Sequence, residues 1–94
     1  MKVLGRRVVE DAGSRHPGLK KRLDAWVSLM DHCAARHIIE LRQLFPSADY
    51  DKNRGYTFFD FGGYRLRAVV QYRVQICQII ALESHDQYDR RNKQ

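Results

Sequence analysis

Apolar and polar residues alternate along the C-terminal half of the chain, as they do in strands that bury one face. Residues Phe58–Phe61 form a short aromatic run, and Gly62-Gly63 behind it is a strong hairpin signal. Tyr64–Gln71 follows as a second strand, and a turn near Tyr72–Val74 leads into an Ile-rich third strand, Gln75–Glu83. The pattern predicts a three-stranded antiparallel meander.

Helical spacing replaces this alternation in the middle of the chain. Apolar residues recur every three or four positions, at 19, 23, 26, 27, 30, 34, 38, 41 and 45. This spacing predicts one long amphipathic helix from Leu19 to Phe45 with one side buried. Pro46 is expected to end it, because the residue before a proline is pushed out of the α region.

Shorter elements are predicted around these two. Lys2–Leu4 suits a first strand, and Arg6–Ala12 suits a short helix that Gly13-Ser14 breaks. Ser47–Gly55 is polar and is expected to form a loop. Ser84 is the expected N-cap of a short C-terminal helix or turn.

Together these elements predict a single α+β domain that spans residues 1–94. An N-terminal strand and two helices are expected to pack on one face of a mainly antiparallel sheet, whose other face stays free. The 94 residues are 44% hydrophobic and 30% charged, which suits one folded domain with a modest core and not a disordered chain.

Charge and cysteine content narrow the class of protein. The net charge of +6 favours a polyanionic partner such as RNA, DNA, a ribosome or an acidic protein, and a merely solvated basic surface is the alternative. Arg6 and Arg7 leave no apolar signal-peptide core after Met1, and no apolar run approaches the ~18 residues of a membrane span. We therefore expect a reduced, cytoplasmic protein in which Cys33 and Cys77 are buried thiols.

The second strand of the meander carries the first candidate functional residues. Strand alternation puts Arg65 and Arg67 on one face, and Leu66, Ala68 and Val70 on the other. A guanidinium is a planar, permanently charged fork that can bind two phosphate oxygens. Arg67 in mid-strand is therefore a candidate phosphate clamp, although an ordinary charge on a polar sheet face remains the alternative.

His85 and Tyr88 follow the last predicted strand. A histidine can take or give a proton near pH 7, and Tyr88 would share its side of a helical turn. With Arg67 they suit RNA cleavage by the substrate's own 2′-hydroxyl, where one group removes the 2′ proton and another protonates the leaving 5′ oxygen. The fixed cation stabilises the charge on the phosphate oxygens. Alternatively, His85 has only a structural role. Tyr88 could instead have one of three other roles: it binds phosphate, stacks on a base or closes the core.

Further candidates are weaker. Arg65 and Arg73, with Lys52 and Arg54 of the polar loop, are candidate RNA-binding cations, and Tyr64 and Tyr72 suit either base stacking or sheet packing. No metal site is expected, because the helical trio of His32, Cys33 and His37 lacks the fourth ligand that structural zinc requires. No cofactor is expected either, since no nucleotide-binding glycine motif occurs.

Short motifs spread over nearly the whole chain form a recognisable set. They are Arg15-His16-Pro17, Ala25-Trp26, Phe45-Pro46-Ser47-Ala48-Asp49, Phe59 to Gly63, Leu66-Arg67 with Val69-Val70, and Ser84-His85 followed by Tyr88-Asp89. Taken together they resemble the HigB toxin family, RelE-like mRNA interferases of bacterial type II toxin–antitoxin modules.

The resemblance implies a RelE-like toxin that cleaves mRNA in the A site of the ribosome and so inhibits translation and growth. It implies a helix-turn-helix antitoxin of the HigA type as partner, and operator DNA bound through that antitoxin. By position, Arg67 would stabilise the phosphate, His85 would be a general acid or base, and Tyr88 would position the substrate or transfer the second proton.

The chain also departs from the family pattern. Asp60 and Tyr64 stand where the family commonly has asparagines around the Gly-Gly pair, and Gln71 and Ile80 replace basic residues. A basic RNA- or ribosome-binding module without catalysis is therefore the alternative function. An antitoxin-type DNA binder is disfavoured, because the C-terminal half is predicted as strands and not as a pair of short helices.

Overall fold

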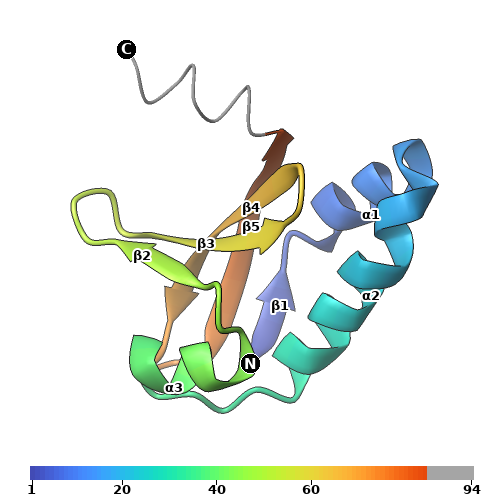
Figure 1. Cartoon of the computed structure of the whole chain (residues 1–94). Helices are drawn as coiled ribbons and strands as arrows, with labels where there is room; N and C mark the ends of the chain where they lie inside the picture. Colours follow the sequence, from blue (N-terminus) through green and yellow to red (C-terminus); the bar gives the residue numbers. More distant parts are fainter. Residues whose placement is uncertain (85–94) are drawn as a thin grey trace.

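A five-stranded sheet carries the candidate site. The structure, a computed structural model, describes residues 1–84. The strands are β1 (Lys2–Leu4), β2 (Asp49–Asp51), β3 (Tyr56–Phe61), β4 (Tyr64–Gln71) and β5 (Ile76–Ser84), in the order β1-β5-β4-β3-β2. Neighbours pair antiparallel except β1, which runs parallel to β5 (Figure 1). The expected α+β domain with a mainly antiparallel sheet is confirmed.

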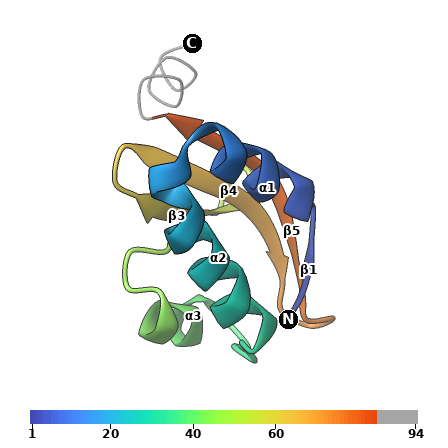
Figure 2. The same ribbon diagram turned by 90° about the vertical axis from the view of Figure 1, so that its right-hand side faces the viewer.

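The helices α1 (Arg6–Arg15) and α2 (Pro17–Asp31) cover one face of this sheet, and α3 (Ile38–Leu44) lies at one end (Figures 1 and 2). The core forms where their apolar sides meet the inward positions of the strands. Its most deeply buried members include Leu23, Met30, Leu41, Leu66 and Cys77. None of the helices within residues 1–84 is long and apolar enough to cross a membrane.

The prediction of one long helix was wrong, because a loop at 32–37 separates α2 from α3. The N-terminal ammonium of Met1 donates to the carbonyls of Met30 at 3.0 Å and Cys33 at 2.6 Å, which satisfies groups that a helix end leaves open. His37 then caps α3 by accepting from the Glu40 N–H. Cys33 and Ala35 are buried in this loop. Ala34, the loop position that the helical spacing predicted to be buried, is exposed instead.

The end of the first helix was also predicted wrongly. α1 continues through Gly13-Ser14 to Arg15 and ends before Pro17. A Cβ on Gly13 would lie 3.3 Å from Cγ of Lys20, so the glycine permits close packing of α1 against α2.

Residues 47–55 were expected to form a loop, but they contain β2, which pairs with β3. With this pairing β3 begins at Tyr56, earlier than predicted. Asp51 forms the turn between them by accepting hydrogen bonds from the N–H groups of Asn53 and Arg54. Ser84 belongs to β5, where it pairs with Tyr64, and the helix or turn that it was expected to cap lies outside the described residues.

Gly5 connects β1 to α1 in a backbone conformation that favours glycine. Its φ is +80°, and a Cβ there would lie 2.5 Å from the carbonyl oxygen of Ile79. We expect Gly5→Ala to lose about 3 kcal/mol of unfolding free energy in urea titrations, from left-handed strain plus a backbone clash. Gly55→Ala is the matched control, since Gly55 has a φ of +77° but open space around it. It should lose only about 1 kcal/mol. Equal losses would contradict the packing of Gly5 on β5.

Alkaline pH should destabilise the fold through Cys77, which is fully buried. Burial, with a smaller effect of Cys33, raises the pKa of its thiol from 9.0 to about 12. Between those values the unfolded chain releases a proton that the folded chain keeps. Stability should therefore fall as pH rises from about 9 to about 12, by up to about 1.4 kcal/mol per pH unit. Urea unfolding at several pH values should show a shallower decline for Cys77→Ala, and an unchanged decline would contradict this.

Candidate functional site

The face of the sheet away from α1 and α2 carries the two strand arginines. Arg65 pairs with Asp60 of β3 and Glu83 of β5, and Arg67 pairs with Phe58 and Ala81. Their neighbours Leu66 and Ala68 are fully buried on the helix-covered side. The predicted segregation of arginines from apolar residues along β4 is therefore confirmed.

Arg67 is fixed in position but keeps hydrogen-bonding capacity. Its Cζ lies 4.8 Å from the ring centroid of Tyr56, a cation–π contact that orients the guanidinium. Its Nη2 lies 3.7 Å from Oε1 of Glu83, which is an ion pair but too long for a hydrogen bond. Its Nε is buried and has no hydrogen-bond partner within residues 1–84. An anion that supplied acceptors would meet an oriented and incompletely satisfied fork.

Arg65 is held in a parallel manner beside it. Its Cζ lies 5.1 Å from the ring centroid of Phe58, and its Nη2 lies 3.7 Å from Oδ2 of Asp49. The other oxygen of Asp49 lies 3.6 Å from Nη2 of Arg42, so β2 and α3 are tied to this face. The rings of Phe58 and Tyr56 are 6.4 Å apart and support both guanidinium groups.

A β-bulge lies at the same place. Arg67 pairs with Ala81 but Ala68 pairs with Ile79, so Ile80 is the extra residue of β5. Bulges re-aim the side chains that follow them, and they are frequent beside functional sites. Here the shift brings Glu83 onto the face of the arginines.

The remaining candidate cations lie in turns and not on the strands that carry Arg65 and Arg67. Lys52 and Arg54 are exposed in the β2–β3 turn, where Nε of Arg54 lies 3.8 Å from Oδ2 of Asp51. Arg73 is exposed in the β4–β5 turn. His85 and Tyr88 lie outside the described residues, so their convergence with Arg67 stays a prediction.

Tyr64 and Tyr72, which were predicted either to stack on bases or to pack on the sheet, have different surroundings. The hydroxyl of Tyr64 lies 3.4 Å from Nδ1 of His16, and their ring centroids are 5.1 Å apart. Tyr72 packs against the core, and burial raises the pKa of its phenol to about 12. Across residues 1–84, no group of three or more His, Cys, Asp or Glu side chains is placed to hold a metal ion.

Sequence reasoning missed Tyr56, Asp49 and Glu83 as parts of the site. Phe58 pairs with Arg67, and strand alternation places Tyr56, two residues earlier, on the same face as Phe58. A predicted β3 that began two residues earlier would therefore have included Tyr56. Asp49 lies on β2, a strand too short for its apolar and polar residues to show an alternation. Glu83 lies on the arginine face because of the bulge, and no sequence pattern predicts that bulge.

Comparison with known proteins agrees with this architecture. Residues 19–91 match a protein-family model described as HigB toxin, the RelE-like toxic component of a toxin–antitoxin system. No curated protein matches the chain significantly. The family match covers more than half of the chain, including all of β4 with its two arginines. The chain therefore belongs to the HigB toxin family, with the α+β fold of RelE-like toxins.

Proposed function

We propose that this toxin is an endoribonuclease that cleaves mRNA in the A site of the ribosome and so stops translation and growth. Family membership supports a toxin with an antitoxin partner, and it suggests a nuclease role in general terms. The observation that carries the proposal is Arg67, a guanidinium held by the Tyr56 ring with a buried Nε that has no partner within residues 1–84.

The proposed chemistry is attack of the substrate's 2′-hydroxyl on the adjacent phosphorus, with departure of the 5′ oxygen. Arg67 would stabilise the charge that grows on the non-bridging oxygens, with its planar fork already oriented before the substrate arrives. Arg65 lies beside it on the same face and would bind a neighbouring phosphate. The route requires no metal ion, because a fixed cation supplies the charge stabilisation and side chains move the protons.

His85 and Tyr88 are proposed as the proton-transfer and positioning groups. His85 follows Ala81, the β5 partner of Arg67, by four residues. The chain can therefore place its Cα no farther than about 14 Å from that of Ala81. This bound is compatible with an imidazole and a guanidinium that act on one phosphodiester.

The partners follow from the same proposal. The substrate is mRNA held by the ribosome, and the basic surface with its net charge of +6 suits both of these polyanions. The antitoxin would be of the helix-turn-helix HigA type, and it would carry the toxin to operator DNA. The proposed site of action is the cytoplasm.

Mapping of mRNA 5′ ends after brief induction of the toxin tests this function. Cleavage predicts new 5′ ends clustered within codons of translated messages, and an Arg67→Ala variant should not produce them. Ribosomes that stall without new ends would instead support a binding module that blocks translation by occupancy.

A further inference from the structure

A pocket lies at the edge of the sheet, on the side opposite to the arginines. Its volume is about 260 Å³, and it is lined by His37, Ile38, Tyr50, Gly55, Val70 and Tyr72. Pockets for drug-sized ligands usually measure about 300–1,000 Å³, so this one suits a single ring system. Tyr50 on β2 is 45% exposed and pairs with Thr57, which places it on the helix-covered side.

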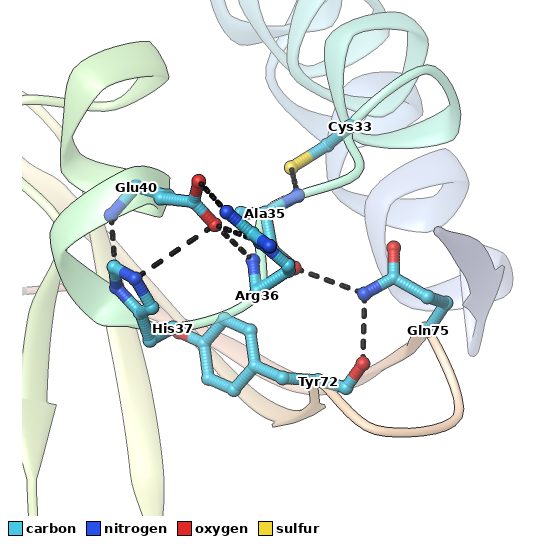
Figure 3. Close-up of polar contacts among 7 residues, drawn as sticks. All are labelled: Cys33, Ala35, Arg36, His37, Glu40, Tyr72 and Gln75. Atoms are coloured by element: carbon cyan, nitrogen blue, oxygen red, sulfur yellow. Dashed lines mark hydrogen bonds and ion pairs between the residues drawn. The ribbon is translucent and has the colours of Figure 1, made fainter.

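The inner wall of this pocket is held in place by a small network (Figure 3). Nε2 of Gln75 donates to the carbonyl of Ala35 at 2.9 Å and to that of Tyr72 at 2.7 Å. These bonds tie the 32–37 loop to the β4–β5 turn. Figure 3 shows the Tyr72 ring beside His37, whose Nδ1 accepts from the Glu40 N–H. The backbone on this side of the pocket is therefore held in place.

Tyr72, which lines the pocket, also carries a polar group that lacks a partner in the described chain. The hydroxyl of Tyr72 is buried and has no hydrogen-bond partner within residues 1–84. A buried polar group without a partner is costly, so an acceptor brought to this wall would gain more than it would in water. An apolar side chain could not satisfy it.

Basic residues lie in the two turns that contribute residues to the pocket. Lys52 and Arg54 stand in the turn between Tyr50 and Gly55, and Arg73 directly follows Tyr72. Gly55 lines the pocket, whereas the next residue, Tyr56, supports Arg67 on the other face. Along β4, Val70 of the pocket is three residues, or about 10 Å, from Arg67. The β2–β3 turn thus separates the pocket from the proposed site of cleavage.

We propose that this pocket binds an unpaired nucleobase of the RNA whose phosphate lies on Arg67, a proposal that rests on the proposed function. Proteins recognise single-stranded RNA by stacking splayed bases on aromatic side chains beside a positively charged path for the backbone. Tyr50 and Tyr72 supply the aromatic surfaces, and the Tyr72 hydroxyl supplies a donor for a base acceptor. Lys52, Arg54 and Arg73 supply the positive path. These three cations were predicted to bind RNA, and they lie in the β2–β3 and β4–β5 turns, which contribute Gly55 and Tyr72 to the pocket.

Binding to 2′-O-methyl RNA nonamers tests the pocket separately from cleavage, because these oligonucleotides have no 2′-hydroxyl to react. A single abasic residue is moved through the nonamer, and each Kd is measured by fluorescence anisotropy. For the wild type, one abasic position should raise Kd about tenfold, as expected for the loss of one stacked base. Tyr50→Leu should raise Kd about tenfold for the intact nonamer and should lose its sensitivity to that abasic position. Tyr72→Phe should change the preference among bases at that position.

Ile39→Ala is the matched control, since Ile39 neighbours the pocket residue Ile38 but is 66% exposed and does not line the pocket. It should keep the wild-type profile. A wild type that binds no nonamer or is insensitive to every abasic position, or a Tyr50→Leu variant with the wild-type profile, would overturn the inference. So would a Tyr50→Leu variant that escapes the antitoxin while its RNA profile is unchanged, because the pocket would then serve a protein partner. Abasic sensitivity without cleavage of ribosome-bound mRNA would remove the proposed function and leave the pocket standing.

Discussion

Replacement of Arg67 by alanine should lower the rate of mRNA cleavage about 10²–10³-fold and restore the growth of cells that express the protein. This size is typical for loss of one preorganised group that stabilises charge in a transition state. Arg67→Lys should also fail, because a lysine keeps the charge but lacks the planar fork that Tyr56 orients. Single-turnover cleavage of ribosome-bound mRNA measures both variants.

Two controls separate chemistry from folding in this experiment. Arg7→Ala removes an exposed arginine on α1, on the other side of the molecule's sheet, and should leave cleavage unchanged. Thermal unfolding should show that Arg67→Ala remains folded, because Arg67 lies outside the main core cluster. A folded Arg67→Ala variant with full toxicity would remove Arg67 from the mechanism.

Replacement of His85 by alanine should lower cleavage about 10²–10⁴-fold, the range expected for loss of a general acid or base. The variant should also lose one limb of the pH–rate profile, which a purely structural histidine would not determine. His32→Ala is the matched control, since His32 is exposed after α2 and its Nδ1 lies 2.9 Å from the carbonyl of Ser28. A His85→Ala enzyme with a normal rate and an unchanged pH profile would exclude His85, and Tyr88→Phe would then be examined as the alternative proton donor.

The sequence predicted the elements in which one periodicity dominates. The hairpin at Gly62-Gly63 and the two faces of β4 follow from alternation and turn chemistry, which act locally. The long helix was wrong because Ala34 alone connected the helical spacing between Met30 and Ile38. In the loop Ala34 is exposed, and Cys33 and Ala35 are buried in its place. A buried N-terminal ammonium at Met1, far away in sequence, helps to end α2 there.

The same distinction separates the site residues that could be predicted from those that could not. Arg65 and Arg67 could be placed on one face because strand geometry alone decides that. Glu83 and Tyr56, which hold Arg67, depend on register between strands, and the bulge at Ile80 shifts that register by one residue. Such pairing is decided by contacts between strands, and no single segment contains that information.

The most direct test of 2′-hydroxyl attack at the Arg67 face uses ribosomes loaded with mRNA that carries one 2′-deoxynucleotide at a mapped cleavage position. The account predicts that the unmodified message is cut there, that its upstream fragment ends in a cyclic phosphate or a 3′-phosphate, and that the deoxy-substituted message survives at that bond. Cleavage of the deoxy-substituted bond, or an upstream fragment that ends in a 3′-hydroxyl, would contradict it.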